Sequence, residues 1–255
     1  MSLAAPLICS QILKVDPNAT DPRNRLLGIG APGHLFGTDH LGRDHLGRLL
    51  FGGQISLAIG FFGAVTTLAV GVVVGMATGY FGGIIDDFSN WVITTMDSLP
   101  ALYLLIAVSA LLRPSPQSLV LVIAITGWTG AARLVRGQTL VIRQLDYVTA
   151  ARALGASPWR IMFAHVFPNL ISILAITLAL GVGGVILAEA TLSFLNLGVQ
   201  APTPTWGNML TDSQSYFRTA GHLIVLPGLL ISVTVLCLYI IGDGVRDAFD
   251  PQTND

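Results

Sequence analysis

The stretch GGQISLAIGFFGAVTTLAVGVVVGMATGYFGGII occupies residues 52–85 and contains no charged side chain. A helix needs about 20 apolar residues to cross the hydrocarbon core of a bilayer, so this stretch is long enough to span a membrane. The whole chain has the same character, because 53% of its 255 residues are hydrophobic and only 11% are charged. Soluble domains carry about 25% charged residues, so the composition argues against a soluble enzyme and for a surrounding of membrane lipid. The formal net charge of −1 also argues against a nucleic-acid partner.

Four further charge-poor stretches follow, and each is long enough for a membrane helix. The predicted spans cover residues 55–80, 92–112, 116–134, 169–190 and 222–242. Pro100 and Pro227 lie inside the second and fifth of these spans and are expected to kink them. The sequence therefore predicts an all-α membrane helix bundle with five spans, and residues 51–255 form its membrane domain.

The first 50 residues differ from the rest because they are rich in proline, glycine, aspartate and arginine. Residues 14–42 are expected to be irregular. Residues 44–54 are expected to form a short amphipathic helix that leads into the first span. Residues 1–13 are apolar but too few to span a bilayer.

A five-residue tandem joins this segment to the first span. Asp39-His40-Leu41-Gly42-Arg43 is followed at once by Asp44-His45-Leu46-Gly47-Arg48. Histidine and carboxylate together suit several divalent metals, but their spacing here is not the i, i+4 pair of a helical metal site. We therefore predict a capped and arginine-anchored helix start rather than a metal site.

Arginines gather in the third connection between the predicted spans. They are Arg133, Arg136, Arg143, Arg152 and Arg160. By the positive-inside rule this connection is expected in the cytoplasm, which places residues 1–50 on the outside. Counted over all loops, the basic residues are nearly balanced, so the predicted orientation depends on this one cluster.

Gly71, Gly75 and Gly79 recur every four residues along the first span, and Gly83 continues the series. Such a stripe of small residues lets another helix approach closely. The stripe predicts either packing inside this chain or a subunit interface, and the sequence leaves both readings open.

Two acidic residues lie at the ends of predicted spans. Asp97 is near the start of the second span, and Glu189 is at the end of the fourth. Ionisable groups at membrane depth are costly and often functional. Each is expected either to accept local hydrogen bonds near an interface or to line a pathway or gate.

The arginine-rich connection is long, and we assign its residues 135–168 to one cytoplasmic loop. Residues 146–154 are compatible with a helix that Asp146 is placed to cap, and Gly155 supplies its stop. Ser157-Pro158 then starts a second short helix. The loop is therefore predicted to form a helical elbow on the membrane surface. The face expected to dock in a partner's groove contains Val148, Ala151 and Leu154.

Parts of this loop resemble a known motif. Thr149-Ala150-Ala151, Gly155 and Phe167-Pro168 are similar, in order and spacing, to the cytoplasmic "EAA" loop of inner-membrane permease subunits of binding-protein-dependent ABC importers. The family's glutamate position holds Thr149 here, and its isoleucine and leucine positions hold His165 and Phe167. Contacts that need the carboxylate are therefore not expected.

Further segments resemble one branch of that family, the second or C-type permeases for dipeptides and oligopeptides. These segments are residues 36–44 (FGTDHLGRD), 146–148 (DYV), 188–195 (AEATLSFL), 202–210 (PTPTWGNML) and 242–247 (GDGVRD). The family usually has six spans, one of them before the G-T-D segment. Residues 4–7 resemble the tail end of that first span.

The resemblance implies a type I importer permease in a bacterial inner membrane that forms half of a pathway for peptides. It implies a sister permease, two cytoplasmic ATP-binding subunits and an extracytoplasmic substrate-binding protein as partners. The residues that it implies for coupling to the ATPase are Thr149, Ala150, Ala151, Leu154, Gly155 and Pro168. Nickel or glutathione is the alternative cargo within the family, and a stand-alone secondary transporter or channel is the alternative class of protein.

No catalytic, cofactor or metal residues are assigned. Residues 28–33 satisfy G-x-G-x-x-G, but a dinucleotide site needs a preceding strand and a following helix, and Pro32 opposes this arrangement. A Walker A motif needs a lysine in its glycine-rich context, which Lys14, the only lysine, lacks. ATP hydrolysis is therefore expected of partner subunits.

Overall fold

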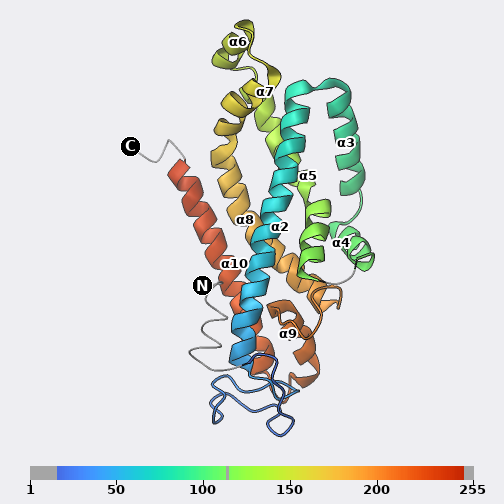
Figure 1. Ribbon diagram of the computed structural model, residues 1–255, viewed down its shortest axis with the longest axis vertical. Coiled ribbons are helices and arrows are strands. Elements are labelled where there is room, and N and C mark those ends of the chain that lie inside the picture. The colour runs from blue at the N-terminus through green and yellow to red at the C-terminus, as the bar shows by residue number, and fades with distance from the viewer. Residues whose placement is uncertain (1–15, 113–114, 250–255) are drawn as a thin grey trace. The chain divides into compact units, whose positions relative to one another are not determined.

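The computed structural model describes residues 16–112 and 115–249, and within these ranges the chain is helical (Figure 1). The main exception is residues 16–44, which are irregular, with turns and two isolated β-bridges, Ala31–His34 and Thr38–Asp44. The predicted all-α fold is confirmed. Residues 1–13, which include the suggested remnant of a first span, lie outside the described ranges.

Long helices make up the membrane domain, and short ones connect them. The long ones are α2 (His45–Phe81), α3 (Gly83–Asp97), α4 (Ala101–Ala110), α5 (Pro116–Ile142), α8 (Phe167–Phe194) and α10 (His222–Phe249). The short ones are α6 (Asp146–Ala153), α7 (Pro158–Ile161), the π-helical η3 (Met162–Val166), α9 (Trp206–Ser213) and the 3-10 turn η4 (Gln214–Tyr216).

Four helices among the described residues are long and apolar enough to cross a membrane, when α7, η3 and α8 are counted as one. A fifth crossing is added if α3 and α4 together form a broken span. These five elements correspond to the five predicted spans, although their bounds differ.

The second predicted span is broken in the middle. A continuous helix was expected over residues 92–112, but α3 and α4 meet there at a bend of 92°. Pro100 lies in the break, has no backbone N–H for the helical ladder, and disfavours helical geometry at Leu99. The expected kink at Pro100 is therefore present, and it is large enough to end one helix and start another.

Other helices run past the limits that the charges suggested. Residues 44–54, expected as a separate amphipathic helix, belong almost entirely to α2, and α5 continues to Ile142. A charge marks where a side chain meets water, whereas a helix ends where a cap, a glycine or a proline stops the backbone ladder. For this reason hydropathy located the spans better than it located the helix ends.

The described residues divide into two compact units. One, here called the entry unit, comprises the described residues up to Phe62 together with Val108–Val120 and Val182–Cys237. The other, here called the elbow unit, comprises Gly63–Ala107, Leu121–Gly181 and the described residues from Leu238 onward. The helices α2, α8 and α10 each contribute one segment to each unit.

The glycine stripe lies against α5 inside the elbow unit. A Cβ atom on Gly71 would come within 2.5 Å of the Ala131 side chain, and one on Gly75 would come within 2.5 Å of the Ala132 carbonyl oxygen. A Cβ on Gly79 would lie 2.7 Å from Thr139. All three glycines thus allow α2 and α5 to pack backbone to backbone in the same chain. Gly83 is not part of this contact, because it starts α3 with a φ of +56°.

Candidate functional site

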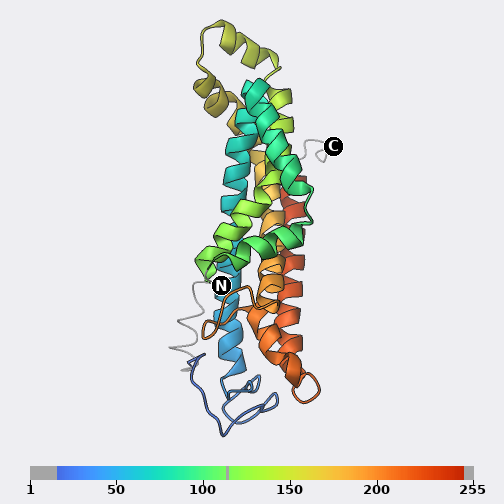
Figure 2. The same cartoon turned by 90° about the vertical axis from the view of Figure 1, so that its right-hand side faces the viewer.

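Residues 143–166 form a helical elbow, whose first helix, α6, lies beyond the ends of α2 and α5 in both views (Figures 1 and 2). α6 follows α5 after a short turn, and α7 leads through η3 into α8. The predicted pair of short helices is therefore present. Its second half is more regular than expected, since residues 158–194 form one helical run instead of a loop that ends at Pro168.

A complete backbone motif ends α6. The N–H of Gly155 donates to the Arg152 carbonyl, and the N–H of Ala156 donates to the Ala151 carbonyl, both at 3.0 Å. These two bonds define a Schellman motif, and they require the left-handed φ of +84° that Gly155 adopts. The predicted stop at Gly155 is confirmed, and the reason is the geometry of its backbone.

The two helix starts in the elbow differ from each other. Ser157 caps α7 as expected, because its side chain accepts the N–H of Arg160 at 3.4 Å and Pro158 occupies the first helical position. Asp146 does not cap α6: Leu145 holds the N-cap position, and Asp146 is the first helical residue. A carboxylate in the first turn still interacts favourably with the helix dipole, which explains why an aspartate is suitable at position 146.

Apolar anchors hold the elbow to the rest of its unit. Val148 and Ile161 are fully buried in a cluster that also contains Met76, Val135 and Leu170. Because Val148 faces this cluster while Leu154 is 89% exposed, the predicted common face of Val148, Ala151 and Leu154 is wrong. The available surface is formed instead by Leu154 and the exposed residues Thr149 and Ala150.

The π-helical turn η3 precedes Pro168, which lies in the first turn of α8. Proline has no N–H to donate to the carbonyl four residues earlier, so a local widening of the helix is the expected response. The side chain of Asn169 donates to the carbonyl of His165 at 2.6 Å and satisfies one of the carbonyls in this turn. His165 also packs against Tyr147 of α6, with ring centroids 6.1 Å apart.

Most arginines of the basic cluster have structural partners. Arg136 forms a bidentate ion pair with Asp86, in which Nε and Nη2 lie 2.5 and 2.6 Å from the two carboxylate oxygens. Nη1 of Arg133 lies 2.5 Å from a carboxylate oxygen of Asp97. Arg143 donates to the carbonyls of Gly79 and Tyr80 at the end of α2, where a cation also complements the helix dipole.

Asp97 thus has two partners in the elbow unit. Its carboxylate contacts Arg133 and accepts a hydrogen bond from the Thr129 hydroxyl at 3.0 Å. These contacts join the end of α3 to α5. The sequence analysis offered two alternatives for Asp97, and these contacts correspond to the local hydrogen-bonding one.

In the entry unit, the G-T-D segment winds tightly ahead of α2. A Cβ atom on Gly37 would lie 2.1 Å from the Leu27 carbonyl oxygen, and one on Gly42 would lie 1.8 Å from that of Asp21. Both glycines also have positive φ angles. Only glycine fits at these two positions, so the spacing of the motif follows from the path of its backbone.

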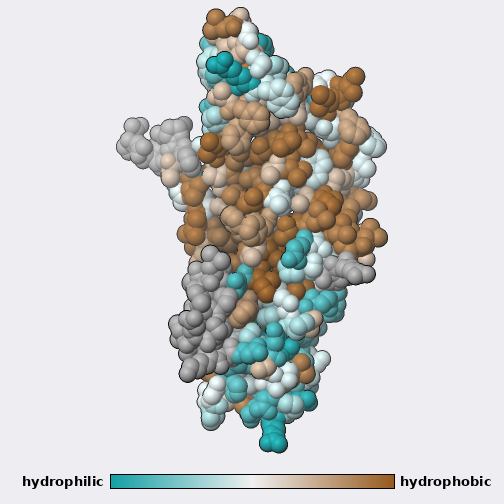
Figure 3. Space-filling model, viewed as in Figure 1, coloured by the Kyte–Doolittle hydropathy of each residue, from teal (hydrophilic) through white to brown (hydrophobic). Residues whose placement is uncertain are grey.

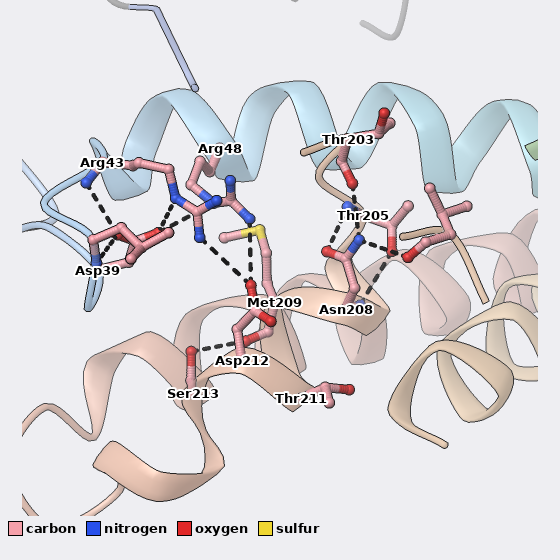
Figure 4. Close-up of polar contacts among 12 residues, drawn as sticks. Asp39, Arg43, Arg48, Thr203, Thr205, Asn208, Met209, Thr211, Asp212 and Ser213 are labelled. Carbon is pink, nitrogen blue, oxygen red and sulfur yellow. Dashed lines mark hydrogen bonds and ion pairs between the residues drawn. The ribbon is translucent and has the colours of Figure 1, made fainter. Parts of the chain in front are cut away.

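Asp39 and the two arginines of the tandem form a buried ionic network (Figure 4). Asp39 accepts the Arg43 side chain at 2.6 Å and the backbone N–H groups of Leu41 and Arg43. Arg43 and Arg48 also approach Asp212 of α9, at 3.5 and 3.7 Å. Burial alone would raise the pKa of Asp39, but the hydrogen bonds and charge of Arg43 outweigh it and lower that pKa below its ordinary value.

The second aspartate of the tandem caps α2. Asp44 accepts the N–H of Gly47 at 2.7 Å, and its other oxygen lies 2.8 Å from Nδ1 of His34. The prediction of a capped, arginine-anchored helix start is confirmed. Among the described residues, no group of three or more metal-ligating side chains is placed to hold a metal ion.

Glu189 is fully buried in the entry unit. Its carboxyl group accepts hydrogen bonds from Ser193 at 2.7 Å and from Ser56 of α2 at 3.1 Å. The Ser56 hydroxyl in turn accepts the N–H of Trp206 at 3.2 Å. The carboxyl group therefore ties α8 to α2 and to the start of α9.

Trp206 and its neighbours are the functional candidates that the sequence analysis did not single out. The Trp206 indole N–H donates to the Leu49 carbonyl at 2.9 Å, and its ring fills the space above Gly53. Thr205 and Asn208 form a capping box that starts α9, as Figure 4 shows. The T-x-x-N spacing is a helix-start signal that would have predicted this helix.

Comparison with known proteins agrees with this architecture. The family described as "Binding-protein-dependent transport system inner membrane component" matches residues 71–255. A dipeptide transport system permease protein of Alkalihalophilus pseudofirmus is 39% identical over 252 residues, which cover 99% of this chain and 81% of the relative. A glutathione transport system permease protein of Pectobacterium atrosepticum is also 39% identical, over 86% of this chain and 73% of the relative.

A solved structure of similar fold is the MetNI methionine ABC transporter in an inward-facing conformation. One of its chains superposes with a TM-score of 0.64 at 18% identity, covering 80% of this chain and 96% of the solved one. An amino acid ABC transporter gives a TM-score of 0.61 at 15% identity. At these identities the likeness shows the fold alone.

Proposed function

Because this chain belongs to the binding-protein-dependent transport system inner membrane component family, we propose that it is the permease subunit of an ATP-driven importer of short peptides. It is a multi-pass component of a bacterial inner membrane. In this proposal it pairs with a sister permease and forms half of the pathway. Two cytoplasmic ATP-binding subunits and an extracytoplasmic binding protein complete the transporter.

One observation carries the coupling role: the elbow is anchored by buried residues yet presents an exposed outer surface. Val148 and Ile161 are fully buried, whereas Leu154 is 89% exposed and follows the exposed Thr149 and Ala150. A rigid element that offers small and apolar side chains suits docking in a groove of another protein. We propose Thr149, Ala150, Ala151, Leu154 and Gly155 as the docking surface, with Pro168 where the elbow joins α8.

The mechanism follows from this anchoring. Movement of the ATP-binding subunits would displace the elbow, and the continuous helical run from α7 through α8 would carry that displacement into the membrane domain. Alternating access needs such a rigid transmission between two states. In this scheme the chain contributes no catalytic group, and partner subunits hydrolyse ATP.

Replacing Leu154 by serine tests the docking surface. Because this side chain is exposed, we expect unchanged thermal stability of the purified chain but loss of copurification with the ATP-binding subunits. Ile84→Ser is the matched control, since Ile84 is 86% exposed in the same unit but lies outside the elbow. Retained copurification of Leu154→Ser, or equal loss with the control, would contradict the coupling role.

The substrate class rests on the relatives. Dipeptide and glutathione permeases match with equal identity, and glutathione is itself a tripeptide derivative, so short peptides cover both. Uptake of a labelled dipeptide by the assembled transporter, with and without excess glutathione or nickel, tests this proposal. Transport by the chain alone in vesicles, without ATP-binding subunits, would instead favour a secondary transporter or channel.

For Glu189 and Asp97 we propose a role in positioning the helices that form the pathway. The hydrogen bonds of Glu189 to Ser56 and Ser193 support this proposal for the entry unit. The contact of Asp97 with Arg133 supports it for the elbow unit. Glu189→Gln retains most of these hydrogen bonds, so it should preserve uptake better than Glu189→Leu does.

A further inference from the structure

A hollow apolar groove lies in the elbow unit between α2 and the run from α7 to α8. Its volume is about 460 Å³, and its lining is apolar and aromatic throughout. Val72, Met76 and Phe81 line it from α2, and Trp159, Phe163 and Leu174 line it from the opposite side. Figure 3 shows hydrophobic side chains gathered on this face, over α2 and α8. The volume falls within the range of pockets that bind small molecules.

One end of the groove carries aromatic rings that remain exposed. Phe81 and Trp159 meet edge to face with centroids 6.4 Å apart, and Trp159 stacks on Phe163 at 6.3 Å. The side chains of Trp159 and Phe163 are 64% and 65% exposed. Tryptophan at the end of a membrane helix is typical of the level of the lipid headgroups.

Two arginines lie next to residues at this end of the groove. Arg152 lies over the ring of Tyr80, 5.9 Å from its centroid, and Tyr80 packs edge to face on Phe81. Arg160 directly follows Trp159 in α7. Within residues 16–112 and 115–249, neither Arg152 nor Arg160 forms an ion pair with an acidic side chain, unlike Arg133 and Arg136. Arg152 thus stands on Tyr80, next to the lining residue Phe81, and Arg160 is the chain neighbour of the lining residue Trp159, with no acidic partner for either among the described residues.

We propose that this groove binds an anionic phospholipid, with one acyl chain along α2 and the phosphate between Arg152 and Arg160. Basic sites beside membrane helices on the cytoplasmic side recognise such headgroups, and the cytoplasmic leaflet is rich in anionic lipid. The proposal uses the cytoplasmic orientation of the elbow but not its docking to an ATPase.

The groove is longer than the hydrocarbon of one leaflet, because its lining on α2 runs from Phe81 to Val65, a rise of about 24 Å, so one acyl chain fills only the part nearer to Phe81. From Phe81 to Val72, α2 rises about 14 Å at 1.5 Å per residue, and one leaflet contributes about 15 Å of hydrocarbon. An acyl chain that starts at the arginines therefore reaches as far as Val72 within a single leaflet. A zwitterionic lipid would fit the same apolar walls but would not compensate the two cations.

Quenching of Trp159 fluorescence by brominated lipids tests the proposal. The full chain is reconstituted in vesicles that contain either brominated phosphatidylglycerol or brominated phosphatidylcholine. The Trp159→Phe variant gives the signal of the remaining tryptophans, which is subtracted. We expect Trp159 to prefer the anionic lipid by roughly fivefold for each arginine at the site.

The variants separate the headgroup from the acyl chain. Replacing Arg152 and Arg160 together by glutamine should abolish the preference, whereas Arg246→Gln, an exposed arginine in the last turn of α10, should leave it unchanged. Ala77 also lines the groove, so Ala77→Phe should fill it and reduce quenching by both lipids. Equal quenching by the two lipids in the parent chain would overturn the proposal.

A protein occupant would give a different result. If quenching is present in the isolated chain but disappears when the chain is purified with its partner subunits, a partner covers the groove and the lipid proposal is wrong. These measurements need no ATP hydrolysis or uptake. Their failure is therefore distinguishable from a failure of the proposed transport function.

Discussion

The elbow and the polar entry to α2 both consist of polar, glycine-containing sequence, yet they are built in opposite ways. At the entry, the charged side chains turn inward: Asp39, Arg43 and Arg48 are buried and bonded to one another. At the elbow, the buried residues are apolar, Val148 among them, and Leu154 is almost fully exposed. The entry is thus an ion-paired structure that joins the start of α2 to α9, whereas the elbow presents an exposed surface that we propose is covered by a partner.

The largest effect on stability is expected at the entry. Asp39→Ala leaves two buried arginines without their nearest carboxylate, and breaking a buried pair costs about 3–5 kcal/mol. Thermal unfolding of the detergent-solubilised chain measures this loss. Asp16→Ala is the control, because Asp16 is an exposed aspartate of the same segment whose carboxylate accepts a local hydrogen bond from the backbone N–H of Asn18. Equal melting temperatures for both variants would show that the network does not hold the entry.

A smaller effect is expected where the elbow is anchored. Val148→Ala removes two buried methyl groups, which at about 0.8 kcal/mol each amounts to about 1.6 kcal/mol. The loss should increase hydrogen exchange in α6 more than elsewhere, and it should lower ATP-dependent uptake. Val141→Ala is the control, since Val141 is 61% exposed in the same unit. Unchanged exchange in α6 would mean that Val148 is not its anchor.

At Gly155 the expected cost lies in the backbone alone. No atom lies within 4 Å of a Cβ placed there, so the penalty of Gly155→Val comes from its φ of +84° and amounts to about 1–2 kcal/mol. We expect uptake to fall far more than the melting temperature. Gly155→Asn, which tolerates the left-handed region, should keep most of the uptake. Equal uptake in the two variants would remove the coupling role of this turn.

The smallest expected effect is the loss of stability at the entry when the pH is lowered. The pKa of Asp39 is lowered in the folded chain, so its contribution to stability is present at neutral pH and is lost as the pH falls through that lowered pKa. Melting temperatures measured down to pH values below the ordinary carboxyl pKa of about 4 should show this loss. The melting temperature of the Asp39→Asn variant should depend less on pH over this range. An identical pH profile for the parent chain and the variant would show that Asp39 does not cause the loss.

Most of the elbow was predictable because its signals are local. Gly155 and Ser157-Pro158 act on neighbouring backbone groups, and the structure uses both as expected. The exposure of Leu154 was not predictable in the same way. Which face of an eight-residue helix is buried depends on the helices packed against it, and in α6 only Val148 is buried.

The entry was predictable in kind but not in detail. The tandem indicated a capped and arginine-anchored helix start, and Asp44 and Arg43 fulfil these roles. The partner Asp212 comes from more than 160 residues later in the chain, so the tandem alone does not reveal it. A separation of 133 residues likewise hid the hydrogen bond between Ser56 and Glu189.

The sequence by itself determined that this chain crosses a membrane, roughly where it does so, and to which family it is similar, because hydropathy and motif spacing are properties of contiguous residues. Only the tertiary structure decided which charges are compensated, where the second span bends, and that α5 lies against the glycine stripe of α2. These features depend on helices that are distant in sequence, whose approach is set by packing and by pairing of buried polar groups rather than by the local pattern of any one segment.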